Sequence, residues 1–268
     1  MNKDYGKILN ICIQKFKYLN YSENTSNIYA HYIKEFLVKT DKYIEHIVSN
    51  DMNAYLTMYR FSSISQQNQI ISALAFLYKK VLNKKYDKVE FTRPIREKKL
   101  PKIIDKTYLI NKILRIKNLK HKAILALAYS TGLRVSEVIN LKINDIDSKR
   151  MIVKINQSKG NKDRIVPLTN DLLKILREYY LEHKPKEFLF NGQKSLKYSA
   201  GSCNQLVKRH IGSEYHFHLL RHSCFTHLTD QGVDIRVIQK LAGHSNPNTT
   251  AIYAQVSTSI LHRLPLGI

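Results

Sequence analysis

The chain carries side chains whose types suit the cleavage of a phosphodiester without a metal ion. They are two arginines, one lysine, two histidines and one tyrosine, in chain order Arg134, Lys159, His218, Arg221, His244 and Tyr253. Guanidinium groups stay charged and donate two parallel hydrogen bonds, so they fit the oxygens on which charge accumulates when a phosphate is attacked. Cleavage also needs a nucleophile and an acid for the departing 5′ oxygen. A covalent intermediate would conserve the phosphodiester energy, so that rejoining would need no ATP.

Two short segments place the arginines at predicted helices. Arg134 follows residues 121–132, which are apolar around most of a helical circumference and predict a buried helix ending at Gly132. An unpaired guanidinium is costly at such a site. Glu137, three residues later, is either a partner that orients Arg134 or an exposed helix carboxylate.

His218 and Arg221 are three residues apart on a helix predicted near 217–231, so both point from one helical face. His218 and His222 are four apart, a spacing that can hold zinc, but the intervening LLR lacks the general-base glutamate of metalloproteases. Neither a metal nor a cofactor is expected.

The order of these residues resembles the tyrosine recombinase family, which includes the phage-type integrases and the Xer-like recombinases. The segments that carry the resemblance are TGLRVSE, SKGNKDR, HLLRH, LAGHS and TTAIYAQV. All six residues match the family's catalytic positions, including the nine-residue interval from His244 to Tyr253. The resemblance covers nearly the whole chain, because the N-terminal helices look like the family's core-binding domain. The NPN segment after His244 departs from the usual pattern.

The resemblance implies a role for each residue. Tyr253 attacks the phosphodiester, forms a 3′-phosphotyrosyl link and frees a 5′ hydroxyl. The phosphate is held by Arg134, Arg221, His218 and His244, and His218 is also a proton acceptor for the tyrosine. Lys159 protonates the leaving oxygen from a β-hairpin in which Lys162 is the competing lysine.

The resemblance also implies partners. The chain is expected to bind double-stranded DNA that carries a specific recombination site. Four copies are expected on two duplexes, and a monomer or dimer in isolation. The apolar tail after Tyr253 is expected to pack on a neighbouring protomer, although docking onto its own domain is the alternative.

A free phenol with a pKa near ~10 is a poor nucleophile at neutral pH. We therefore expect the surrounding cations to lower the pKa of Tyr253. We further expect the six side chains to converge around one phosphate. A phenol that points into a packed interior would argue against this convergence.

The charge balance favours a polyanionic partner. The chain has 44 Lys and Arg against 21 Asp and Glu, a formal net charge of +23, and the excess is present in both halves of the sequence. Self-repulsion of this size opposes compaction unless phosphates neutralise it. A ribosomal or membrane-surface protein is the general alternative, and charge alone does not distinguish DNA from RNA.

The hydrophobic pattern predicts a mainly α protein with a small β-hairpin, in two domains that clamp DNA in a C shape. Residues 1–92 read as a helical bundle, with helices near 5–19, 22–38, 50–60 and 66–83. Residues 93–101 contain two prolines and several basic residues, which suit an extended linker. Residues 102–268 read as the catalytic domain with a C-terminal tail. Its predicted elements are helices near 121–132, 170–183, 200–211, 217–231 and 234–242, a short helix at LRVSEVINL, a hairpin at 151–168, and a helix containing Tyr253.

Three unpaired cysteines suit a reducing compartment, and neither a signal peptide nor an 18-residue apolar run is evident. A cytoplasmic protein without a membrane partner is therefore expected. Two alternatives to a recombinase remain at this stage. A type IB topoisomerase shares much of the chemistry, and a non-catalytic DNA-binding regulator would share the scaffold.

Overall fold

The computed structural model describes residues 4–84, 93–94, 102–158, 162–193, 195–243, 249–251 and 253, apart from the side chains of residues 157, 158 and 162. The chain divides into two compact units, Met1–Lys98 and Lys99–Ile268. Most of the linker predicted at 93–101 lies outside the described residues. Each unit is considered by itself.

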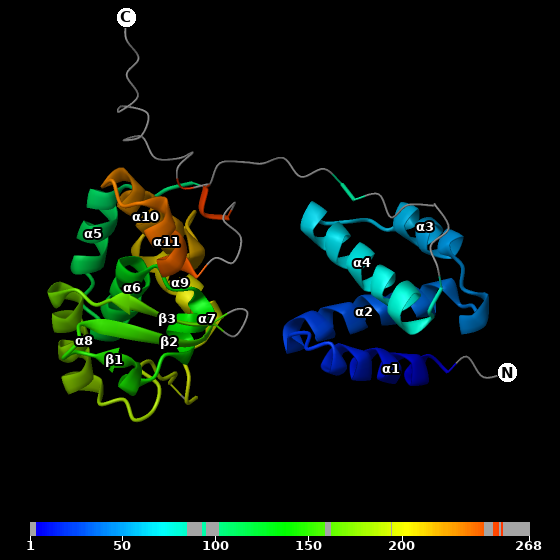
Figure 1. Ribbon diagram of the computed structural model, residues 1–268, viewed down its shortest axis with the longest axis horizontal. Helices are drawn as coiled ribbons and strands as arrows, with labels where there is room; N and C mark the ends of the chain where they lie inside the picture. Colours follow the sequence, from blue (N-terminus) through cyan, green and yellow to red (C-terminus); the bar gives the residue numbers. More distant parts are fainter. Residues whose placement is uncertain are drawn as a thin grey trace, which may run out of the picture. The chain divides into compact units, whose positions relative to one another are not determined.

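The first unit is a helical bundle, as the apolar periodicity predicts. Its elements are α1 (Tyr5–Tyr18), α2 (Glu23–Thr40), the short 3₁₀ helix η1 (Ile44–His46), α3 (Ser49–Met58), α4 (Ile64–Phe76) and the π-helical turn η2 (Leu77–Val81). Ser22 caps α2, because its hydroxyl accepts the Thr25 backbone N–H at 3.2 Å. Helix α2 packs against α1, α3 and α4 (Figure 1). The aromatic side chains of Phe16, Phe36 and Phe76 lie in this core.

The second unit combines helices with a small sheet (Figure 1). Its elements are α5 (Lys106–Leu114), α6 (Leu119–Thr131), α7 (Val135–Asn140), η3 (Ile143–Asp145), β1 (Ile146–Asp147), β2 (Ile152–Ser158), β3 (Lys162–Pro167), α8 (Asn170–His183), α9 (Ala200–His210), α10 (Phe217–Asp230) and α11 (Ile235–Ala242). The prediction of a mainly α protein with a small hairpin is confirmed. Helix α5 and strand β1 were not predicted from the sequence.

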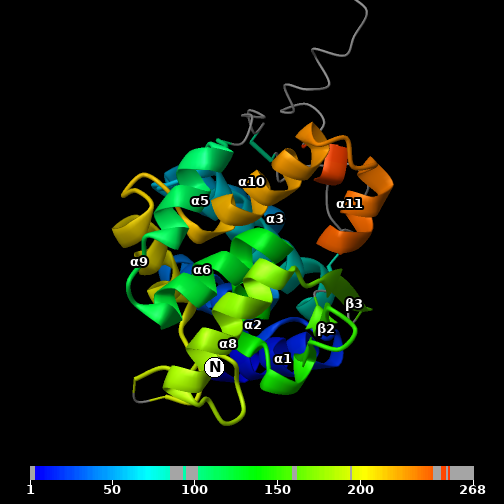
Figure 2. The same cartoon turned by 90° about the vertical axis from the view of Figure 1, so that its left-hand side faces the viewer.

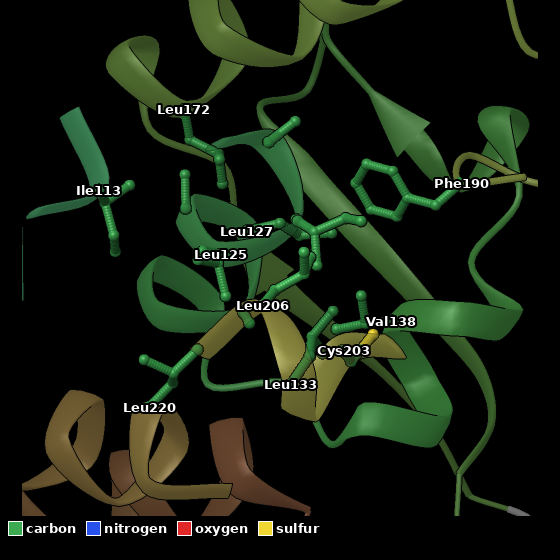
Figure 3. Close-up of a cluster of buried hydrophobic side chains, with 14 of the residues drawn as sticks. Ile113, Leu125, Leu127, Leu133, Val138, Leu172, Phe190, Cys203, Leu206 and Leu220 are labelled. Atoms are coloured by element: carbon green, nitrogen blue, oxygen red, sulfur yellow. The ribbon is translucent and has the colours of Figure 1, made fainter. Parts of the chain in front are cut away.

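Helix α6 lies at the centre of the second unit. Residues 123–128 are all buried, as expected for a helix that is apolar around its circumference. Helix α6 contacts α5, α7, α8, α9 and α10. Figure 2 shows α5, α8, α9 and α10 around it. Side chains from these helices pack around Leu125 and Leu127 of α6 (Figure 3). The C-terminal end of α6 is therefore held from several sides, and it is where the candidate site begins.

The three strands described in this unit form one antiparallel sheet in the order β1–β2–β3. Val153 pairs with Val166 and Ile155 pairs with Arg164. The two valines and Ile155 are buried, which places this face of the hairpin against the core. Strand β3 also contacts α11. Across the described ranges, every helix is too short or too polar to cross a lipid bilayer.

Candidate active site

The turn after α6 sets the position of Arg134. Gly132 has φ +62°, the left-handed conformation that favours glycine. A Cβ atom there would lie 2.5 Å from Cζ of Phe225, so α10 packs directly against the turn. Leu133 is buried, and Arg134 then stands at the start of α7. The left-handed end predicted at Gly132 is confirmed.

Glu137 holds Arg134, as one of the two sequence interpretations expects. The Arg134 Nη1 donates to Glu137 Oε1 at 2.9 Å, and the Arg134 backbone N–H donates to Oε2 at 2.8 Å. The Glu137 side chain is only 5% exposed, whereas that of Arg134 is 21% exposed. Glu137 is therefore a buried counter-ion, and the alternative of an exposed helix carboxylate is wrong.

A second arginine explains how this carboxylate remains charged. Burial alone would raise the pKa of Glu137, but hydrogen bonds and charge from Arg164, with Arg134 adding to them, hold that pKa at about 2. Because the pKa of Glu137 is lower in the folded chain than its ordinary value of 4.5, the ionised carboxylate stabilises the fold fully above about pH 4.5. This stabilisation is lost as the pH falls toward 2.

This shift gives a stability prediction for Glu137→Gln. The wild-type chain should be more stable than the variant at pH 6, and the difference should shrink by about 1 kcal/mol at pH 3.5. Urea unfolding at the two pH values measures the difference. Glu178→Gln, at an exposed carboxylate of α8, is the matched control. A difference that does not change with pH would contradict the low pKa of Glu137.

Helix α10 supplies Arg221, the most deeply buried charged residue of the site at 1% exposed. Its Nη1 donates to the Gly132 carbonyl and its Nη2 to the Ala242 carbonyl, both at 2.6 Å. The guanidinium also lies over the Phe225 ring, 4.8 Å from the centroid. Burial, followed by the charge of Arg134, lowers the pKa of Arg221 to about 10. The guanidinium is thus protonated at neutral pH.

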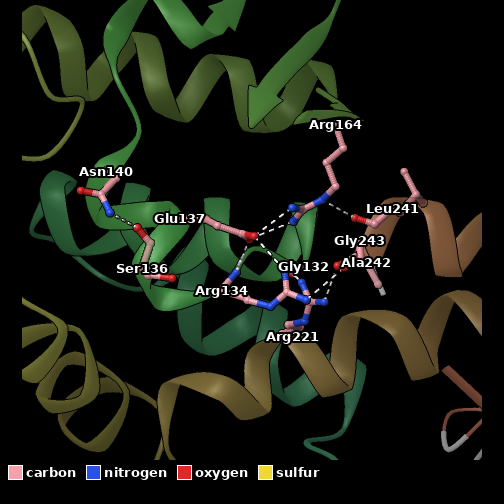
Figure 4. Close-up of polar contacts among 10 residues, drawn as sticks. All are labelled: Gly132, Arg134, Ser136, Glu137, Asn140, Arg164, Arg221, Leu241, Ala242 and Gly243. Atoms are coloured by element: carbon pink, nitrogen blue, oxygen red, sulfur yellow. Dashed lines mark hydrogen bonds and ion pairs between the residues drawn. The ribbon is translucent and has the colours of Figure 1, made fainter. Parts of the chain in front are cut away.

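The C-terminal end of α11 connects three arginines. The consecutive carbonyls of residues 241, 242 and 243 accept hydrogen bonds from Arg164, Arg221 and Arg134, at 2.8, 2.6 and 3.3 Å. Figure 4 shows these guanidinium groups gathered around Glu137 and this helix end. The last carbonyls of a helix lack partners within it and carry partial negative charge, so they suit cations. Segments separated by more than 100 residues are brought together in this way.

His218 lies one turn before His222 on α10, and the two ring centroids are 4.6 Å apart. The His218 side chain is exposed, but its ring nitrogens are partly desolvated by the surrounding protein. This desolvation, followed by the charges of His222 and Arg221, lowers the pKa of His218 to about 4. The imidazole is therefore neutral at pH 7, the form that accepts a proton. Among the described residues, no group of three or more His, Cys, Asp or Glu side chains could hold a metal ion.

Tyr253 is buried rather than accessible, with 1% of its surface exposed. Its ring packs against Phe225 and His222, with centroids 5.4 and 5.8 Å away. The hydroxyl takes part in a hydrogen bond with Arg221. The structure thus places the phenol oxygen at the buried arginine, but packs the ring into the interior, which the sequence argument did not expect.

Burial also decides the acidity of this phenol. Loss of hydration raises the pKa of Tyr253, and the opposing effects of Arg221 and Arg134 are smaller. The expectation that the cations give a net lowering is therefore wrong for this arrangement. Their influence has the expected sign, but it is outweighed by burial.

Four of the six predicted residues are described, and the structure brings Arg134, His218, Arg221 and Tyr253 together. Lys159 and His244 lie outside the described residues, as does the side chain of Lys162. The tail after Tyr253 lies outside them as well.

Sequence reasoning missed Arg164. A signal was available, because side chains alternate along a strand and Arg164 lies on the same face as Val166, which is buried. Its side chain is 8% exposed, whereas the neighbouring Ile165 is 58% exposed. A charged residue at an inward position of a strand indicates a buried partner.

Comparisons with known proteins agree with this geometry. Residues 94–259 match the phage integrase family, and residues 8–88 match the phage integrase N-terminal SAM-like domain. The tyrosine recombinase XerA of Pyrococcus horikoshii is 34% identical over 254 residues, which cover 90% of this chain and 86% of XerA. A tyrosine recombinase of Thermosipho africanus is 32% identical over 256 residues, or 88% of this chain and 90% of that protein.

Solved structures show the same fold. The crystal structure of XerA recombinase is 26% identical, covers 97% of both chains and has a TM-score of 0.57. The post-cleavage complex of XerH site-specific recombinase with palindromic difH substrate is 22% identical, covers 96% of this chain and 82% of XerH, and has a TM-score of 0.73. The chain therefore belongs to the phage integrase family, and it is a tyrosine recombinase, an enzyme of site-specific DNA recombination. Neither a topoisomerase nor a non-catalytic regulator is supported by these relatives.

Proposed function

We propose that Tyr253 is the nucleophile and that Arg134 and Arg221 bind the scissile phosphate. The observation that carries this proposal is the hydrogen bond between the Tyr253 hydroxyl and the Arg221 guanidinium. A phosphate bound by Arg221 would lie next to the phenol oxygen. Arg134 acts on the same phosphate from the partly exposed side of the arginine cluster.

The reaction conserves bonds and protons. The phenol oxygen attacks phosphorus, the bond from phosphorus to the 5′ oxygen breaks, and a 3′-phosphotyrosyl link forms. The proton of the phenol passes to neutral His218. Lys159 donates a proton to the 5′ oxygen, and His244 adds a hydrogen bond to the phosphate. The freed 5′ hydroxyl of a partner strand then reverses the step, so neither ATP nor a metal is consumed.

The packed position of Tyr253 requires a movement in this scheme. In-line attack needs the phenol oxygen opposite the leaving oxygen, about 3–3.5 Å from phosphorus. A ring that is 1% exposed does not reach a bound duplex from its place between Phe225 and His222. We propose that the ring rotates away from these two side chains when DNA binds, and that the phosphate then replaces the phenol as a partner of Arg221.

Double-stranded DNA with a specific recombination site is the proposed partner. The net charge of +23 suits a polyanion, and the similar XerH chain was crystallised bound to its difH substrate. Arg134 lines a cleft of about 600 Å³ together with Lys142 and Lys197, which would accept the backbone next to the scissile phosphate. Each of the two units contributes to DNA binding. The chain is a monomer or dimer in isolation, and four copies assemble on two duplexes.

Trapping of the covalent intermediate tests this proposal. The purified chain is incubated with a randomised duplex library in which each duplex carries a nick near the cleavage position, so that cleavage releases a short fragment and traps the enzyme. Covalent complexes are recovered under denaturing conditions and their DNA is sequenced. We expect one preferred sequence and a 3′ phosphate attached to the peptide that contains Tyr253. A complex on another residue, or none, would overturn the proposal, and relaxation of supercoiled DNA without sequence preference would favour a topoisomerase.

A further inference from the structure

Arg164 is a buried guanidinium that the reaction scheme above does not use. Its Nη1 and Nη2 donate to the two oxygens of Glu137, each at 2.8 Å, in a bidentate ion pair. Its Nε donates to the Leu241 carbonyl at 2.8 Å, at the end of α11 (Figure 4). A side chain of strand β3 thus connects α7 with α11, the two segments that also hold Arg134.

The carboxylate of Glu137 is fully occupied by this arrangement. Each carboxylate oxygen has about two acceptor positions. Oε1 accepts from the guanidinium groups of Arg134 and Arg164, and Oε2 accepts from the Arg134 backbone and Arg164. A second guanidinium N–H of Arg134 therefore finds no acceptor position left on Glu137. The Arg134 guanidinium therefore donates to Glu137 through Nη1 alone and to the Gly243 carbonyl through Nη2, which leaves its remaining N–H groups for another anion.

The end of α11 is shaped around Arg164. Gly243 has φ +61°, and a Cβ atom there would lie 3.1 to 3.4 Å from Cδ, Nη1 and Cζ of Arg164. The Gly243 carbonyl in turn accepts from Arg134 Nη2 at 3.3 Å. Arg164 therefore limits where the last turn of α11 lies, and through it the acceptor that orients Arg134.

We propose that Arg164 is a positioning residue for recombination, which directs Arg134 toward the scissile phosphate by saturating Glu137 and fixing the end of α11. The inference rests on the proposed role of Arg134 as a phosphate ligand. Without Arg164, Glu137 captures Arg134 in a bidentate pair. That pair turns the guanidinium away from the phosphate and neutralises much of its charge.

If Glu137 captures Arg134 in this way, a second substitution should partly restore the cleavage rate lost with the first. Arg164→Met keeps an unbranched apolar stem but removes the guanidinium and its charge, and it should slow single-turnover cleavage of the selected duplex by about 10²-fold, with DNA affinity changed by less than about threefold. The double variant Arg164→Met, Glu137→Gln lacks the carboxylate that captures Arg134. It should regain about tenfold over Arg164→Met, because coupled residues are non-additive. A purely structural role of Arg164 predicts that the double variant is as slow or slower.

Two further variants complete the test. Arg164→Lys keeps the charge but not the planar guanidinium, so its cleavage rate should fall between those of wild type and Arg164→Met. It replaces Arg164→Met in the test if circular dichroism shows that Arg164→Met does not fold. Arg150→Met, at an exposed arginine, is the matched control. Wild-type rates in the folded Arg164 variants, or no gain in the double variant, would overturn the inference alone. Absence of a covalent complex with wild type would overturn the proposed function and the inference with it.

Discussion

Replacing Arg221 by lysine is expected to slow strand cleavage by at least about 10³-fold, although the positive charge is retained. The guanidinium donates to two backbone carbonyls, those of Gly132 and Ala242, and lies over the Phe225 ring. A lysine ammonium is a point donor and cannot bridge both carbonyls while presenting a planar fork to a phosphate. One carbonyl then loses its partner in a buried position, which costs about 1–3 kcal/mol.

Single-turnover cleavage and urea unfolding measure the two consequences separately. Arg150→Lys makes the same chemical change at an exposed position and should leave both quantities near wild type. Arg221→Lys should remain folded at 25 °C with a lower free energy of unfolding. If it cleaves within tenfold of wild type, Arg221 does not stabilise the charge on the phosphate, and its role is confined to joining the turn after α6 to α11.

The fold was predictable wherever a local signal and burial agreed. Helix α6 is apolar on all sides and ends at a glycine, and the structure places it at the centre of its unit with Gly132 in the left-handed conformation. Helix α5 was missed, although Asp105 caps it and Leu109 and Ile113 are buried one turn apart, because it is short and follows a stretch without periodicity. Strand β1 has two residues and carries no periodic signal of its own.

The sequence predicts the residue types of the candidate site but not the hydrogen bonds that join them. The order of the motifs indicates which arginines matter, yet it does not reveal that three consecutive carbonyls at the C-terminal end of α11 accept from three different guanidinium groups. Such contacts join segments that are distant in sequence, so no local pattern encodes them. The acidity of Tyr253 depends on the balance between desolvation and nearby charge, and residue types alone give only the second of these.

Removal of the Tyr253 hydroxyl alone should abolish covalent attachment to DNA. Tyr253→Phe preserves the ring that packs against Phe225 and His222, so the fold should lose about 1–3 kcal/mol, the cost of one buried hydrogen bond to a charged group. No other described phenol is shown bonded to Arg221, and a phenylalanine ring has no nucleophilic atom. Denaturing gels with the nicked duplex should show no adduct, while filter binding shows unchanged DNA affinity.

Tyr179→Phe is the matched control, because Tyr179 is also 1% exposed and its hydroxyl donates to the Leu189 carbonyl at 2.9 Å. Both variants lose one buried hydrogen bond, so a general effect of destabilisation would slow cleavage in both. Loss in Tyr253→Phe alone separates the chemistry from the packing. An adduct that persists in Tyr253→Phe would show that another residue attacks the phosphate. The bond from the Tyr253 hydroxyl to Arg221 would then be structural, as the bond from Tyr179 to Leu189 is.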